Sequence, residues 1–239
     1  MPPVVACLHY LNDVFTGHAG AVLVDAGVSI DNRHLLAGEP LPPIDEIDGV
    51  VAFGGDQSVT RIDSDPMLLA SAEFLRSCVA RDVPVFGVCL GAQLLAHALG
   101  GSVARLPRRI VEWTPIEVLP AAAGDPVAGS LPDGAMALHW NEDGFQPPPE
   151  GVELLARVSA GGEMFRFGDS AWGIQFHPEV DGPGLDSWYA EGGRELAEAG
   201  VGEDDARAAD AVHLPGQRAL SEALFGGFAR VVAARTVAA

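Results

Sequence analysis

The sequence contains no lysine: its 14 basic residues are all arginines, set against 33 Asp and Glu residues. The formal net charge is −19. Without lysine, the chain cannot form a Schiff base, use a lysine as general base, or carry a G-x-x-x-x-G-K-[ST] phosphate loop. Because there is also no basic stripe, the acidic surface repels nucleic acid and anionic lipid, and we expect neither as a partner.

Long apolar runs are absent and cysteine is scarce. No stretch of about 18 apolar residues is free of charges and breakers, so we expect no membrane span. The N-terminus has no basic region before its apolar stretch and does not resemble a signal peptide. Three cysteines, Cys7, Cys78 and Cys89, are too few and too scattered for a disulfide framework or a zinc site. We therefore expect no metal, no cofactor and a reducing cytoplasm as the location.

Short apolar runs alternate with helical patterns in the first half of the chain. The predicted elements there are strands at 3–10, 48–55 and 83–88 and helices at 17–27 and 65–82. Strands that are apolar on both faces predict a parallel sheet covered by helices. Residues 102–177 instead show short strands separated by turns, among them "SVARL" and "RIVEWTPIEVL", and residues 185–239 return to helix.

We therefore predict an α/β fold with an open, mostly parallel sheet, helices on both faces and a small antiparallel insertion. No repeat or long linker divides the chain, so residues 1–239 are expected to form a single domain.

The segment "VPVFGVCLGAQLLAHALGG" places Cys89 between a strand and a helix. Gly87 and Gly91 flank it at the two positions where side chains would collide in a tight turn, which is the cysteine version of a nucleophile elbow. At a helix N-terminus the thiolate is favoured. A buried structural thiol is the alternative for such a cysteine considered alone.

A second block, "AWGIQFHPEV", ends a predicted strand in His177, Pro178 and Glu179. In an extended segment residues two apart face the same side, so His177 and Glu179 point together. An imidazole beside a carboxylate is the base and orienter that a nucleophile needs, and parallel strands carry their sites at their carboxyl ends. Cys89, His177 and Glu179 are thus predicted to form a catalytic triad. The alternative is that His177 and Glu179 are surface residues in a turn.

A third strand ends in the glycine pair Gly54 and Gly55 of "VVAFGGDQSV". Glycine lets backbone approach a ligand closely. The backbone N–H groups of Gly55 and Leu90, the residue after the nucleophile, are predicted to form an oxyanion hole. Considered alone, a glycine pair after a strand is also consistent with a simple turn.

These blocks, "GGDQSV", "GVCLGAQLLAHALGG" and "GIQFHPEV", resemble class I glutamine amidotransferase domains, in particular stand-alone proteins similar to the glutaminase half of GMP synthase. The resemblance is strong over residues 48–180 and implies a flavodoxin-like fold. It also implies that Gln93 helps to bind substrate. "HWNEDG" stands where those proteins carry an H-W-H-G-D-type segment, which makes Asn141 and Asp143 candidate substrate-binding residues. Glu142 is a departure: an added carboxylate there could select a different γ-glutamyl compound.

The resemblance further implies that Cys89 attacks the side-chain amide carbon of glutamine, that ammonia leaves through His177, and that a glutamyl thioester is then hydrolysed. The ammonia would serve a synthetase on another chain, because 239 residues leave no room for an acceptor domain. The alternatives are a free-standing hydrolase of γ-glutamyl amides or peptides and a silent regulatory subunit. The expected partners are glutamine or a γ-glutamyl compound and a possible synthetase.

Overall fold

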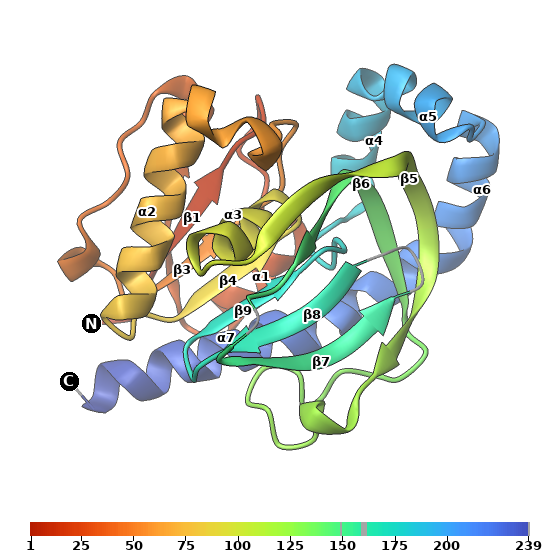
Figure 1. The fold of residues 1–239 in the computed structure, drawn as a ribbon. Helices are drawn as coiled ribbons and strands as arrows, with labels where there is room; N and C mark the ends of the chain where they lie inside the picture. The colour runs from red at the N-terminus through yellow and green to blue at the C-terminus, as the bar shows by residue number, and fades with distance from the viewer. Residues whose placement is uncertain (149, 159–161, 239) are drawn as a thin grey trace.

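The computed structural model describes residues 1–148, 150–158 and 162–238 (Figure 1). Its strands form one sheet of nine in the order β2-β1-β3-β4-β9-β8-β7-β5-β6. The strands are β1 (Val4–His9), β2 (Ser29–His34), β3 (Gly49–Ala52), β4 (Val85–Val88), β5 (Ser102–Val118), β6 (Met136–Gln146), β7 (Val152–Val158), β8 (Gly162–Phe167) and β9 (Ala171–Ile174). The α-helices are α1 (Gly17–Asp25), α2 (Pro66–Ala80), α3 (Leu90–Ala98), α4 (Gly182–Glu191), α5 (Gly193–Ala199), α6 (Glu203–His213) and α7 (Gln217–Ala238).

Five adjacent strands, β2, β1, β3, β4 and β9, run parallel to one another. The central strands β3, β4 and β9 are four-residue runs buried along their whole length. Strands of this kind are stable only when both faces of the sheet are covered. Helices α1 and α7 pack on one face, and α2 and α3 on the other (Figure 1). The predicted α/β fold with helices on both faces is confirmed.

The remaining strands continue the same sheet through antiparallel pairings, so the expected insertion is part of the main sheet. Among the described residues the sheet is mixed, with four parallel and four antiparallel pairings. The two strands expected at 102–106 and 109–119 form one long strand, β5. A register shift between Arg105 and Ile110 accommodates Pro107, which cannot donate a hydrogen bond to the ladder.

Strand β2 was not predicted, because its sequence "SIDNRH" shows neither an apolar run nor alternation. It lies at the edge of the sheet and pairs with β1 alone. Polar edge strands of this kind resist pairing with another chain, which explains why the usual signal is missing.

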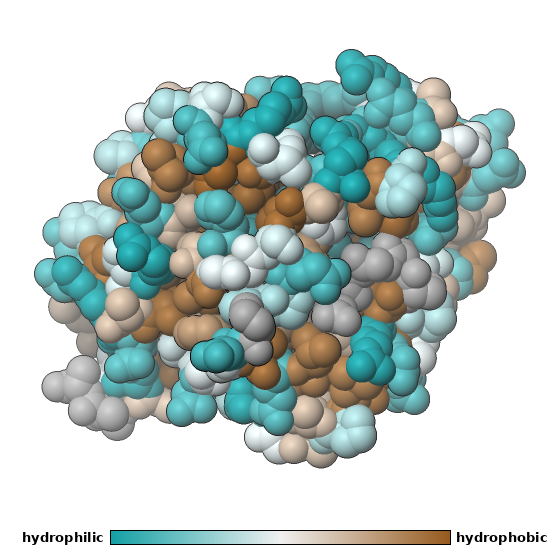
Figure 2. Space-filling view, viewed as in Figure 1, coloured by the Kyte–Doolittle hydropathy of each residue, from teal (hydrophilic) through white to brown (hydrophobic). Residues whose placement is uncertain are grey.

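Helices α4, α5 and α6 pack against β5 and β6 beyond the carboxyl ends of the parallel strands (Figure 1). The buried side chains of this cluster include Val111, Leu138, Trp140, Leu185, Tyr189 and Leu196. Figure 2 shows hydrophilic side chains over the outer surface of α4 and α5. None of the helices in the described ranges is long and apolar enough to cross a membrane.

The turn from β4 into α3 has the geometry expected of an elbow. Cys89 adopts φ of +50° and ψ of −108°, a backbone conformation that residues other than glycine rarely adopt. A Cβ atom at Gly91 would collide with the carbonyl oxygen of Ala52, and one at Gly87 would lie 2.7 Å from the Ala92 nitrogen. Gly91 therefore lets α3 start directly against β3, and Gly87 lets α3 lie directly against β4.

We expect Gly91→Ala to lower the free energy of unfolding by about 1–3 kcal/mol or more, because the added methyl group meets the rigid backbone of β3. Chemical denaturation followed by far-UV circular dichroism measures this loss. Gly193→Ala, where no atom lies within 4 Å of the new Cβ, is the matched control and should be nearly neutral. Equal stability of the two variants would contradict the close packing of α3 against β3.

Candidate active site

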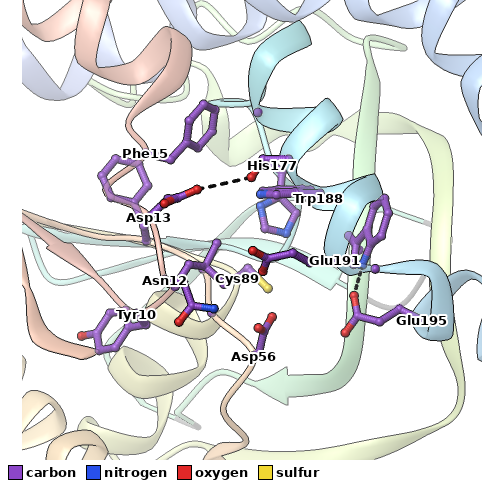
Figure 3. Close-up of a pocket in the computed structure, with 18 of the residues that line it drawn as sticks. Tyr10, Asn12, Asp13, Phe15, Asp56, Cys89, His177, Trp188, Glu191 and Glu195 are labelled. Carbon is purple, nitrogen blue, oxygen red and sulfur yellow. Dashed lines mark hydrogen bonds between the residues drawn. The ribbon is translucent and has the colours of Figure 1, made fainter. Parts of the chain in front are cut away.

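A cavity of about 770 Å³ opens at the carboxyl ends of the parallel strands. The loops after β1 and β3, the β4–α3 turn, the segment after β9, and helices α4 and α5 contribute its walls. Figure 3 shows the sulfur of Cys89, the imidazole of His177 and the carboxylates of Asp56 and Glu191 facing this common space. The position agrees with the rule that open α/β sheets carry their sites at the carboxyl edge.

Cys89 lies on the cavity wall with 6% of its surface exposed. Its backbone N–H donates to the carbonyl oxygen of Ile174 at 2.8 Å, which ties the elbow to the end of β9. The side-chain amide of Gln175 donates to Sγ at 3.4 Å. This contact links the sulfur of Cys89 to the buried side chain of Gln175.

His177 and Glu179 form the expected pair. Nδ1 of His177 lies 2.8 Å from Oε1 of Glu179, and both side chains are buried. Burial alone lowers the pKa of His177, but the negative charges of Glu179 and Cys89 and the hydrogen bond with Glu179 outweigh burial and raise that pKa well above its usual value. The imidazole therefore favours the protonated form.

Gly54 brings the two halves of the predicted triad together. A Cβ atom at Gly54 would lie 3.0 Å from Cε1 of His177 and 3.6 Å from Cβ of Cys89. The backbone of Gly54 thus occupies the space between these two side chains, and only glycine leaves it free. The other imidazole nitrogen, Nε2 of His177, has no hydrogen-bond partner among the described residues.

The predicted oxyanion donors, Gly55 and Leu90, also lie at this end of the cavity. Among the described residues no acceptor is found for the N–H of either one. A Cβ at Gly55 would lie 2.6 Å from Cβ of Tyr10 and 2.9 Å from Cδ2 of Leu90, so the packing leaves room only for glycine at this position. Their role in holding an oxyanion stays a prediction.

Gln93, Asn141 and Asp143 do not line the cavity. Gln93 is buried and donates to the backbone oxygen of Asp143 at 3.1 Å and to Oε1 of Gln175 at 3.2 Å. Asn141 donates to the same backbone oxygen at 3.0 Å, and the Asp143 carboxylate accepts from Ser58. These residues form a buried support behind Cys89, with Gln175 as the link, and contact of their side chains with substrate stays a prediction.

Two walls of the cavity were not predicted from the sequence. One is the loop of residues 10–15, and the other is formed by Trp188, Glu191 and Glu195 of α4 and α5. Trp188 packs edge-on against His177, with ring centroids 4.9 Å apart. No motif marks either wall, because both are brought to the site by tertiary packing alone.

Glu142, the departure noted in the sequence, does line the cavity. Its carboxylate forms ion pairs with Arg105 and Arg109, and Arg109 also contacts Glu195 at 2.8 Å. Glu142 is therefore part of a charged network at the cavity wall. Within the described ranges no group of three or more His, Cys, Asp or Glu side chains is arranged to hold a metal ion.

Comparison with known proteins places the chain in a family. The family model for class I glutamine amidotransferases matches residues 25–189. The chain is 34% identical over 168 residues to a glutamine-hydrolyzing GMP synthase subunit from Haloquadratum walsbyi, covering 70% of this chain and 84% of that protein. It is 29% identical over 168 residues to a gamma-glutamyl-L-1-hydroxyisopropylamide hydrolase from Pseudomonas, covering 66% of this chain and 56% of that protein.

The same fold occurs in a solved structure. A glutamine amidotransferase from Thermotoga maritima superposes with a TM-score of 0.84 at 23% sequence identity, covering 97% of this chain and 99% of that one. This likeness shows the fold, whereas the family model spans more than half of the chain and shows the family. The protein belongs to the class I glutamine amidotransferase family.

Proposed function

We propose that this protein hydrolyses a γ-glutamyl amide bond, with Cys89 as nucleophile, His177 as acid and base, and Glu179 as the residue that orients the imidazole. The observation that carries the proposal is the arrangement around Gly54, where the Cys89 side chain and the buried His177–Glu179 pair approach one point of the cavity wall. A nucleophile, a base and an orienter in contact are the requirements for acyl transfer.

In the first step the Cys89 thiolate attacks the γ-carbonyl carbon, and the oxygen develops negative charge between the N–H groups of Gly55 and Leu90. The C–N bond then breaks, and the proton on Nε2 of His177 passes to the departing nitrogen, which leaves as an amine or ammonia. In the second step the neutral imidazole takes a proton from water, and the resulting hydroxide attacks the thioester. Glutamate is released, and the thiolate and the imidazolium are restored.

Glu179 acts through His177. Its Oε1 fixes Nδ1 as the nitrogen that carries the permanent proton, which leaves Nε2 available for the proton transfers of the reaction. The carboxylate also favours the imidazolium, as the raised pKa of His177 reflects.

The volume of the cavity favours an N-substituted amide over glutamine. About 770 Å³ is within the range that holds drug-sized ligands, and glutamine is smaller than these. The similarity to a protein named as a gamma-glutamyl amide hydrolase supports the same choice. We therefore place the free-standing γ-glutamyl amide hydrolase first.

A second candidate is a glutaminase that delivers ammonia to a synthetase on another chain. The observation that favours it is the similarity to a protein named as a GMP synthase subunit. The silent regulatory subunit has less support, because Cys89, His177 and Glu179 all line the same cavity.

Cys89→Ser should reduce turnover by at least about 10³-fold with the fold intact, because a serine hydroxyl is not ionised at neutral pH. A glutamine-derived electrophile should label Cys89 in the unmodified protein. Cys7 and Cys78 are fully buried, and burial raises both pKa values, that of Cys78 to about 12. Mass spectrometry of peptides from labelled protein locates the adduct, and an adduct on Cys7 or Cys78 would show the assignment to be wrong.

Glu179→Gln should lower kcat by roughly 10²- to 10⁴-fold and change KM little, because the carboxylate stabilises the imidazolium without touching the substrate. Steady-state kinetics separates the two constants, and thermal unfolding confirms that the variant is folded. Glu222→Gln, which removes an exposed carboxylate on α7, is the control and should keep wild-type kinetics. Wild-type kcat in the Glu179 variant would reduce this residue to a structural acid.

The isolated protein should hydrolyse an N-alkyl γ-glutamyl amide at about 10 per second, a typical rate for a self-sufficient enzyme, and glutamine more slowly. Amine and ammonia release measured in parallel tests this. Slow turnover of every amide, raised many-fold by a protein that co-purifies with the chain, would favour the glutaminase subunit over the hydrolase.

A further inference from the structure

The cavity carries an excess of acidic side chains. Apart from Glu179, its carboxylates are those of Asp13, Asp56, Glu142, Glu191 and Glu195. The guanidinium groups on the same walls are those of Arg61, Arg105, Arg109 and Arg194.

Ion pairs account for only part of this charge. Glu142 and Glu195 are paired, since Arg109 contacts both and Arg105 contacts Glu142. Arg194 pairs outside the cavity with Glu198. Three carboxylates, those of Asp13, Asp56 and Glu191, have no ion-pair partner in the described part of the chain, and Arg61 has none either.

Asp56 and Glu191 reach the cavity from opposite walls, one from the loop after β3 and the other from the end of α4 (Figure 3). Burial of part of its side chain raises the pKa of Asp56, and the negative charges of Glu195 and Glu191 raise it further. Carboxylates so placed repel one another across the space that a ligand would occupy. A cleft lined by one sign of charge concentrates ligands of the opposite sign.

The γ-glutamyl group does not balance this charge. It carries one ammonium and one carboxylate, which can be matched by one of the three unpaired carboxylates and by Arg61. Two carboxylates then still face the cavity without a cation. These carboxylates are exposed at the cavity wall, where they attract a positive charge on the other half of the substrate, the amine that leaves.

Two further features favour a ligand in this space. Nε2 of His177 belongs to a side chain that is 3% exposed and lines the cavity, and it has no hydrogen-bond partner among the described residues. An unsatisfied buried nitrogen of this kind requires a group of the ligand. Trp140 and Trp188 also line the cavity, and indole rings attract ammonium groups.

We propose that the substrate is a γ-glutamyl amide of a diamine or longer polyamine, whose far ammonium group is held by the unpaired carboxylates, Asp56 and Glu191 above all. This inference rests on the proposed hydrolase function and names its substrate class. The chemistry is that given above: the γ C–N bond breaks, the departing nitrogen takes the proton of His177, and the diamine leaves with its second amine still protonated.

Three γ-glutamyl amides of nearly equal length test the inference. The departing amines are 1,4-diaminobutane, 1-aminopentane and 5-aminopentanoate, which end in an ammonium, a methyl and a carboxylate group. We expect kcat/KM for the diamine amide to exceed that for the pentyl amide by at least about tenfold, the worth of one charge-assisted contact. The amide ending in a carboxylate should be the poorest substrate, and added salt should reduce the preference.

The double variant Asp56→Asn, Glu191→Gln should bring the ratio of kcat/KM between the diamine and pentyl amides close to one. Asp204→Asn on α6, an exposed carboxylate away from the cavity, is the control for loss of charge and should keep the wild-type ratio. Equal kcat/KM for the three amides in the wild type, or an unchanged ratio in the double variant, would overturn the inference while the hydrolase function stands. Hydrolysis of none of them, with no labelling of Cys89, would overturn the proposed function itself.

Discussion

The close approach of α3 to β3 at Gly91 is the contact on which the site depends. Because no side chain separates Gly91 from the carbonyl of Ala52, the helix begins directly after Cys89, and the Gly91 N–H bonds to the Phe53 oxygen at 3.1 Å. The Cys89 N–H bonds to Ile174 in the neighbouring strand. The elbow is thus held by both adjacent strands, and the chain that follows Ile174 brings His177 to the same edge.

Parallel strands explain why the sequence predicts that Cys89, His177 and Glu179 lie at one edge of the sheet. Cys89 and His177 each follow the last apolar residue of a buried strand, and adjacent parallel strands end at one edge of the sheet. Glu179 follows from the two-residue period of extended chain. These inferences depend only on local sequence pattern and one topological rule. They therefore hold although the sequence predicts the wrong boundaries for β5 and does not predict β2.

The cavity walls could not be predicted in this way. The loop of residues 10–15 takes its course from distant contacts, such as the hydrogen bonds from His34 to the Leu11 oxygen and from Gln57 to the Tyr10 oxygen. The direction of the Gln93 side chain could not be predicted from the sequence either. The sequence could not show that nearly all of α3 is buried, so that this side chain turns toward Gln175 and the β6 backbone instead of the cavity.

The absence of lysine also bears on the chemistry of the cavity. The only side chains with a permanent positive charge are arginines, and two of those that line the cavity, Arg105 and Arg109, are already held by Glu142, Asp143 and Glu195. A planar guanidinium in several ion pairs is fixed in place, whereas a lysine could swing toward an unpaired carboxylate. Charge left over at Asp56 and Glu191 is therefore not neutralised from within the wall, and a bound ligand becomes the natural source of the missing positive charge.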